Sequence, residues 1–226
     1  MFYYGGNSKN SRKWSKYGEV PACDVNSPLG QKRLKAWKTG KTGFPVIDAW
    51  MRELVATAWM GNRGRQTVAS FLVYNLFIDW RYGAEFFEHH LIDHSVAINY
   101  VMWNIMAGIG WLLETRTFNV ILQSRKWEPD GSFIRKWVPE LKDCPTGFIH
   151  TPWDWPEIGL YPELEIYRNP IIDKHTFRYE KYKPEPSAPP SIVLEKKSVD
   201  KNFDEIKRFN NNGHKAVLSS AAEVVF

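Results

Sequence analysis

The chain has 226 residues, a mass of 26.4 kDa and 43% hydrophobic residues, which is enough to bury one good core. Its formal net charge of +5 and its pI near 9.1 favour a polyanionic partner such as nucleic acid, although a lysine-rich solvated tail gives the same totals. Its two cysteines, Cys23 and Cys144, have no CxxC partner and no histidine at finger spacing, so neither a disulfide framework nor a zinc site is predicted.

Targeting signals are weak in this sequence. No run approaches eighteen apolar residues, so no membrane span is predicted. The amino end lacks the apolar segment and the cleavage site of a secretory signal, and the compartment stays open. Eleven tryptophans exceed the needs of packing, which indicates that some of them face a ligand.

The chain divides into three regions by composition. Residues 1–33 read as an irregular basic lead-in, interrupted by Gly and Pro. Residues 34–155 read as a helical domain, in which apolar residues recur at helical spacing. Within it we expect four helices, at about 45–60, 63–77, 83–92 and 95–107. Residues 156–226 read as a Pro- and aromatic-rich extension followed by a tail of low order.

Polar residues gather at the junctions between these helices. Arg63 and Arg65 stand at the amino end of the second helix, where backbone N–H groups already favour an anion such as phosphate. A solvated helix start explains the same spacing. Asp79, Glu85 and Asp93 are candidate ion-pair partners of these arginines.

Metal and nucleotide motifs are missing. His90 and His94 have the i, i+4 spacing of a zinc site, but Leu91 stands where the zincin motif needs Glu, and we expect no metal site. The sequence has no GxGxxG and no GxxxxGK[ST]. Trp59, Trp80 and Trp103 lie on successive helices beside polar junctions. They are interpreted either as core fillers or as an electron relay to a redox cofactor.

Nine segments carry a resemblance to a known family: KTGFPVIDA at 41–49, NRGRQ at 62–66, ASFLV at 69–73, IDWR at 78–81, GAE at 83–85, RTFN at 116–119, GSFIR at 131–135, WVPEL at 137–141 and HTPW at 150–153. Over roughly residues 30 to 155 the chain resembles the helical FAD-binding domain of the cryptochrome/photolyase family. The NRGRQ and WRYGAE forms are most similar to cryptochrome DASH.

The resemblance implies an all-α domain that holds FAD, which after reduction and excitation by blue light donates an electron to a pyrimidine dimer in DNA. The residues that it assigns to FAD are Asn62, Arg65, Asp93 and Asn99, the last facing flavin N5. It places Trp103 and Trp80 as the inner and middle members of a tryptophan relay, so that these two and Asn99 form the expected catalytic set. Arg63 and Gln66 are the expected DNA contacts, and no metal is expected.

The chain also departs from the family pattern. It starts just beyond the family's α/β antenna domain, so we expect that domain and its pigment to be absent. Ser27 falls where the outer tryptophan of the relay is expected, Ser95 replaces an aspartate of the FAD site, and Ile105 replaces an aromatic residue of the dimer pocket.

The expected function is that of a FAD-binding, blue-light-responsive DNA photolyase or cryptochrome domain, either a lyase that repairs pyrimidine dimers or a photoreceptor. The expected partner is DNA, single-stranded or containing dimers, and a further partner that covers an exposed helical face is a second expectation. The alternative is a non-enzymatic remnant that binds nucleic acid without FAD. A third hypothesis is an incomplete gene product whose fold needs residues upstream of Met1.

Overall fold

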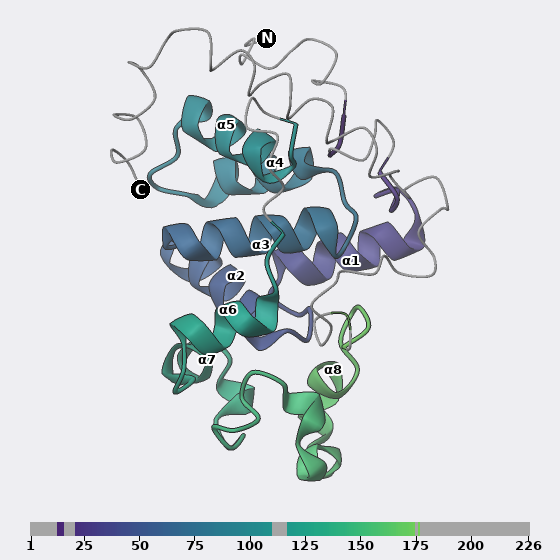
Figure 1. Cartoon of the computed structure of the whole chain (residues 1–226), viewed down its shortest axis with the longest axis vertical. Helices are drawn as coiled ribbons and strands as arrows, with labels where there is room; N and C mark the ends of the chain where they lie inside the picture. The colour runs from purple at the N-terminus through teal and green to yellow at the C-terminus, as the bar shows by residue number, and fades with distance from the viewer. Residues whose placement is uncertain (1–12, 16–20, 110–116, 175, 177–226) are drawn as a thin grey trace, which may run out of the picture. The chain divides into compact units, whose positions relative to one another are not determined.

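The computed structural model describes residues 13–15, 21–109, 117–174 and 176, all inside one compact unit formed by residues 1–188. These ranges are helical and contain no β-strand (Figure 1). The α-helices are α1 (Pro28–Lys38), α2 (Pro45–Thr57), α3 (Asn62–Tyr74), α4 (Trp80–His90), α5 (Val96–Met106), α6 (Val120–Trp127), α7 (Ser132–Trp137) and α8 (Glu165–Arg168). Short 3-10 helices η1 to η4, at Pro139–Leu141, Pro152–Asp154, Pro156–Leu160 and Pro162–Leu164, each begin with a proline.

The all-α prediction and the four central helices α2 to α5 are confirmed, with shifted ends. Helix α2 stops before the expected position because Ala58 takes a left-handed φ of 58°, which breaks the helical hydrogen-bond pattern. Helix α4 begins three residues before Gly83 because the Asp79 carboxylate accepts a hydrogen bond from the Arg81 N–H at 2.9 Å.

Helix α1 corrects the prediction of an irregular lead-in, which is wrong over residues 28–33. The Ser27 hydroxyl accepts a hydrogen bond from the Gly30 N–H at 3.0 Å, and Pro28 occupies the first helical position. This start signal is present in the sequence. The scarcity of apolar residues in the helix hides it, because only Gly30, Arg33 and Trp37 are buried.

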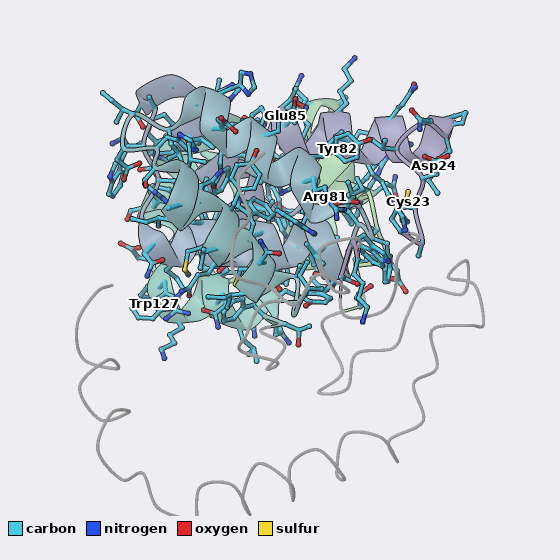
Figure 2. The ribbon with its side chains drawn as sticks, turned by 90° about the horizontal axis from the view of Figure 1, so that it is seen from above. Cys23, Asp24, Arg81, Tyr82, Glu85 and Trp127 are labelled. Carbon is cyan, nitrogen blue, oxygen red and sulfur yellow. The ribbon has the colours of Figure 1, made fainter. Side chains whose placement is uncertain are left out.

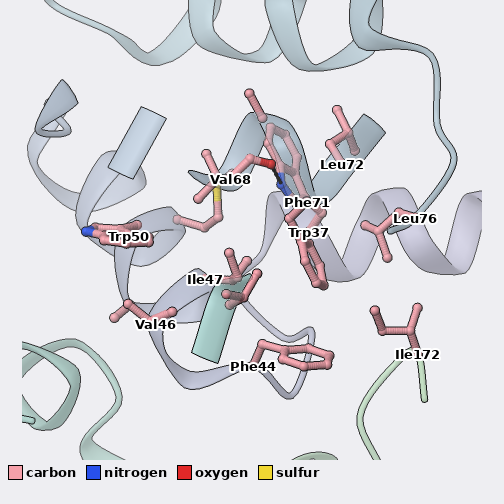
Figure 3. Close-up of a cluster of buried hydrophobic side chains, with 14 of the residues drawn as sticks. Trp37, Phe44, Val46, Ile47, Trp50, Val68, Phe71, Leu72, Leu76 and Ile172 are labelled. Carbon is pink, nitrogen blue, oxygen red and sulfur yellow. Dashed lines mark hydrogen bonds between the residues drawn. The ribbon is translucent and has the colours of Figure 1, made fainter. Parts of the chain in front are cut away.

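Helix α3 occupies the middle of the unit, with α4 and α5 on one side and α2 and α6 on the other (Figure 1). Its Val68 carbonyl accepts a hydrogen bond from the Trp37 indole N–H at 3.0 Å, which joins α3 to α1 (Figure 3). Around this bond, large apolar side chains from α2, from α3 and from the chain on either side of these helices are fully buried, among them Phe44, Ile47, Met51, Leu54, Phe71, Leu72 and Leu76.

The KTGFPVIDA segment forms a buried polar support for α2. The Asp48 carboxylate, with no exposed surface, accepts hydrogen bonds from the Thr42 N–H and hydroxyl, both at 2.7 Å, and from the Gly43 N–H at 3.0 Å. Arg52, one turn later, donates to both carboxylate oxygens of Glu140 at 2.7 and 2.9 Å. This recognisable motif therefore holds the loop before α2 against that helix.

The core continues past residue 155, where the helical domain was expected to end. Leu164, Tyr167 and Ile172 are buried in the same cluster as the α2 and α3 side chains. The Thr42 carbonyl accepts a hydrogen bond from the Ile171 N–H at 2.9 Å. The expected boundary is displaced because Pro156 and Pro162 each start a 3-10 helix with a buried residue, and the chain after them continues the core. The expected low-order tail lies outside the described residues, and no helix within them is both long and apolar enough to span a bilayer.

Candidate functional site

Arg65 of α3 and Asp93 of the α4–α5 loop form an ion pair. The Nη2 group of Arg65 donates to both carboxylate oxygens of Asp93, at 2.8 and 3.0 Å. The Nε group of Arg65 donates to the Met60 carbonyl at 2.7 Å, so two anchors fix the guanidinium plane. The side chains are 27% and 48% exposed, which leaves Nη1 of Arg65 open to a further acceptor.

Asn99 lies in the first turn of α5 and is buried. Its Nδ2 group donates to the Ala84 carbonyl of α4 at 2.9 Å, and this bond determines which end of the carboxamide is nitrogen. Its Oδ1 atom accepts no hydrogen bond from any residue that the structure describes. The amide is therefore held in one orientation, and its Oδ1 atom can accept a hydrogen bond from a ligand.

Apolar side chains are exposed next to this ion pair. Trp59 is 50% exposed and precedes Met60, whose carbonyl binds Arg65. Ile92 is 81% exposed and precedes Asp93, and its N–H donates to the Ala58 carbonyl at 2.8 Å. Asn62, at the start of α3, is exposed as well. A few fixed polar groups among apolar surface are the usual composition of a small-molecule site.

Arg63 is held on the opposite side of the start of α3 by aromatic rings. Its guanidinium carbon lies 5.6 Å from the centroid of the Phe118 ring and 5.2 Å from that of the Trp127 ring. Its Nη1 group donates to Oε1 of Gln66 at 3.1 Å. Arg63 and Gln66, the predicted DNA contacts, are thus brought together, with Gln66 buried beneath the arginine.

The two predicted relay tryptophans occupy different surroundings. Trp103 is 2% exposed and packs edge to face against Phe87 and Trp37, at 5.2 and 6.3 Å between ring centroids. Trp80 packs edge to face against Tyr100 at 6.1 Å and donates to the Lys13 carbonyl at 3.2 Å. Within the described ranges no ring contact joins Trp80 directly to Trp103.

The positions that depart from the family pattern have local roles. Ser27 caps α1, as described above, and Ser95 sits at the amino end of α5 without capping it through its side chain. Ile105 is buried. Asp79, one candidate partner of Arg63 and Arg65, instead binds Arg81 at 2.7 Å.

The histidines near the α4–α5 loop do not form a metal centre. His89 and His90 each direct Nδ1 at the backbone carbonyl four residues earlier, at 2.7 and 2.8 Å. Among the residues that the structure describes, no group of three or more His, Cys, Asp or Glu side chains could hold a metal ion.

The sequence did not single out Phe118 and Trp127 as parts of a site. Both come from chain that lies far beyond α3 in sequence, and their contact with Arg63 depends on where α6 packs. One signal was available, because Lys126-Trp127 follows Arg125 and so places an aromatic residue within a basic run.

Comparison with known proteins identifies the family of the chain. The family described as "FAD binding domain of DNA photolyase" matches residues 6–183. A cryptochrome DASH of Gloeobacter violaceus is 51% identical over 148 residues, and a deoxyribodipyrimidine photo-lyase of Escherichia coli is 46% identical over 150 residues. The crystal structure of a Synechocystis cryptochrome superposes with a TM-score of 0.56 at 44% identity, covering 66% of this chain and 30% of that one.

The two curated relatives are much longer than the matched region. The aligned part covers 63% of this chain and 29% of the Gloeobacter protein, and 65% of this chain and 31% of the Escherichia coli protein. The family match itself covers most of the chain. The chain therefore belongs to the family of photolyase and cryptochrome FAD-binding domains.

Proposed function

We propose that the chain binds FAD through Arg65, Asp93, Asn99 and Asn62, and that it serves a light-responsive photolyase or cryptochrome whose partner is DNA. The observations that carry the proposal are the ion pair of Arg65 and Asp93 and the carboxamide oxygen of Asn99, which accepts no hydrogen bond from the described residues. These groups are fixed before any ligand arrives, which lowers the ordering cost of binding.

The residues present fit such a cofactor. A flavin ring has polar edges and apolar faces, and the site offers a free Nη1 donor on Arg65, a free acceptor on Asn99 and exposed apolar surface on Trp59. A bound flavin would supply light-driven one-electron chemistry. Asp93 holds the Arg65 guanidinium in place, and the Asn99 oxygen is free to accept a hydrogen bond from a ring N–H.

Trp103 and Trp80 are proposed as the oxidisable side chains that serve the flavin. Trp103 is shielded from solvent among aromatic rings, and Trp80 contacts the backbone of residue 13. Ser27 cannot be oxidised as an indole can, and it is committed to capping α1. We therefore expect no photoreduction through position 27.

DNA is the proposed partner because Arg63 is presented as a phosphate ligand. Phe118 and Trp127 fix the plane of its guanidinium, and Gln66 occupies one of its terminal nitrogens. The remaining N–H groups have the fork geometry that suits a phosphate. The placement of Arg63 also favours the second candidate function, nucleic-acid binding without FAD. None of the groups that hold Arg63 is assigned to the flavin.

Bound flavin per chain, after removal of free flavin, tests the cofactor. We expect Asn99→Ala and Asp93→Asn to lower flavin content at least about tenfold, since each removes a fixed polar partner. Asn104→Ala is the matched control, because Asn104 also lies on α5 and donates to a backbone carbonyl, that of Tyr100. Equal flavin content in all four proteins would reject the assignment.

DNA binding is tested separately through its dependence on salt. Arg63→Ala should weaken binding to every sequence and reduce the salt slope by about one, the value for one lost phosphate contact. An unchanged slope would exclude Arg63 as a phosphate ligand. Light-driven loss of pyrimidine dimers from bound DNA would then indicate repair. Flavin binding without dimer loss would favour photoreception, and DNA binding without bound flavin would favour the second candidate function.

A further inference from the structure

Trp127 is a large aromatic side chain left on the surface at the end of α6. It is 46% exposed, and Figure 2 shows it at the edge of the part drawn with side chains. Two cations lie near its ring: the Arg63 guanidinium carbon at 5.2 Å and the Lys126 Nζ at 5.1 Å from its centroid. Burial in a core does not account for an indole with this exposure.

The indole is held in one orientation before anything binds it. Its Nε1 group donates to Oε1 of Gln123, one turn earlier on α6, at 3.0 Å. Arg63 is held in turn by Gln66 and by the Phe118 ring. Lys126 has no such second anchor among the described residues and has a flexible stem. A planar ligand can therefore displace the Lys126 ammonium from the Trp127 ring while Arg63 stays in place.

The charges around the indole suit a polyanion. Arg125 and Lys126 are exposed in the last turn of α6, and Arg63 lies beside them. The carboxylate of Glu128, the next residue after Trp127, is only partly exposed. Phosphates can approach the three cations, and a flat π-system can lie on the indole.

We propose that Trp127 stacks on an unpaired base of single-stranded DNA while Arg63 and Lys126 bind the adjacent phosphates. The proposal rests on the proposed DNA partner and extends it with a base contact at Trp127. In a duplex each base face is already covered by its neighbours, so a surface indole can stack only where a strand is unpaired. Aromatic side chains beside basic residues are the usual means of binding single strands without sequence preference.

The test compares two labelled oligonucleotides of equal length with the full chain, by fluorescence anisotropy. One is oligothymidine and the other has the same backbone with abasic sugars. Trp127→Ala should weaken binding of oligothymidine between about fivefold and a hundredfold, the usual worth of one stacked base, and leave binding of the abasic strand unchanged. Trp127→Phe, which keeps a ring, should recover most of the affinity.

Charge variants separate stacking from phosphate binding. Lys126→Ala should weaken binding of both oligonucleotides alike. Lys136→Ala should weaken neither, and it is the matched control because Lys136 lies 5.2 Å over the Trp137 ring in a similar lysine–indole pair away from Arg63. Thermal unfolding and bound flavin are measured for each variant. Absence of bound flavin from the original chain, with intact oligothymidine binding, would reject the cofactor proposal alone.

Three results would overturn the inference. The first is oligothymidine affinity in Trp127→Ala equal to that of the original chain. The second is an equal loss for the abasic strand or for a duplex, which would show that the ring only positions Arg63. The third is failure of Trp127→Phe to recover affinity while its unfolding temperature matches the original.

Discussion

Asp48 and Asp93 show how the same residue type takes structural and functional roles. Asp48 is fully buried, and Thr42 and Gly43 donate three hydrogen bonds to it. Asp93 is about half exposed and binds Arg65, which still has a free donor. Hydrogen-bonding groups that remain open to a ligand after folding thus indicate a site. The Asp48 carboxylate, in the strongest sequence motif, is instead occupied by Thr42 and Gly43.

The Asp48 carboxylate predicts a pH dependence of stability. Burial raises its pKa to about 6, from an ordinary 3.8. Because the folded chain holds the proton more tightly, this group favours folding most below about pH 4, and that contribution is lost as the pH rises through about 6. Relative to Asp48→Asn, the original chain should lose up to about 3 kcal/mol of unfolding free energy over this window.

Urea unfolding of both proteins, from about pH 4 to about pH 7, measures that difference. The other titrating groups are common to the two proteins and cancel. The variant should be the less stable of the two at low pH, since its amide cannot accept every bond that Asp48 accepts. A difference in stability that stays constant with pH would show that Asp48 does not titrate as described.

Residue-scale prediction from the sequence succeeded for one pair of oppositely charged residues on neighbouring elements. Arg65 and Asp93 were named as candidate partners, and their ion pair is confirmed. The stacking of Arg63 on Phe118 and Trp127 could not be predicted, because it depends on how α6 packs against α3. The roles assigned to Asn62, Arg65, Asp93, Asn99, Trp80 and Trp103 remain predictions.

At the scale of elements, the contact of α4 with α5 depends on one glycine. A Cβ atom on Gly83 would lie 2.2 Å from Cη2 of Trp103 and 2.7 Å from Cδ2 of Leu72. The helices can approach this closely only because position 83 has no side chain. The same approach places the Ala84 carbonyl within reach of Asn99.

Gly83→Ala should therefore destabilise the fold, by about 1–3 kcal/mol for an overpacked core, despite the better helix propensity of alanine. Gly147→Ala is the matched control, because a Cβ there meets no atom within 4 Å, and its effect should stay within about 0.5 kcal/mol. Chemical unfolding of both variants checks this prediction. Similar midpoints for the two would mean that α4 and α5 are not packed as closely as described.

Helices were predictable where apolar spacing is strong, and their ends were not. The apolar stripes of α2 and α3 gave their positions, but the left-handed Ala58 and the Asp79 cap decided where α2 ends and α4 begins. Helix α1 was missed because its helical signal lies in its cap, Ser27 and Pro28, and not in its periodicity.

At the scale of the molecule, the proline-rich stretch after residue 155 belongs to the core. Leu164, Tyr167 and Ile172 are at most 5% exposed, and Arg52 of α2 reaches both Glu140 and the Tyr167 hydroxyl. Composition indicated an extension because prolines are frequent in it. It could not show that Pro156 and Pro162 begin 3-10 helices that return Ile158 and Leu164 to the core.

A chain ended at residue 155 should accordingly lose cooperative unfolding. Burying three large side chains stabilises by roughly 1.5–3 kcal/mol each, which is a large part of the 5–15 kcal/mol typical of a domain. A chain ended at residue 188 keeps these side chains and is the control. Calorimetry of the two chains measures the cooperativity of their thermal unfolding. A sharp unfolding transition in the shorter chain would show that the domain ends at residue 155.

The central claim, that this chain holds FAD at the junction of α3 with the α4–α5 loop, is tested most directly by an absorption spectrum. The protein would be expressed with excess riboflavin and then separated from free flavin. Structured flavin bands in the near ultraviolet and blue, lost in Asp93→Asn, are the predicted result. A folded but colourless protein would contradict the claim and leave nucleic-acid binding through Arg63 and Trp127 as the function that the structure supports.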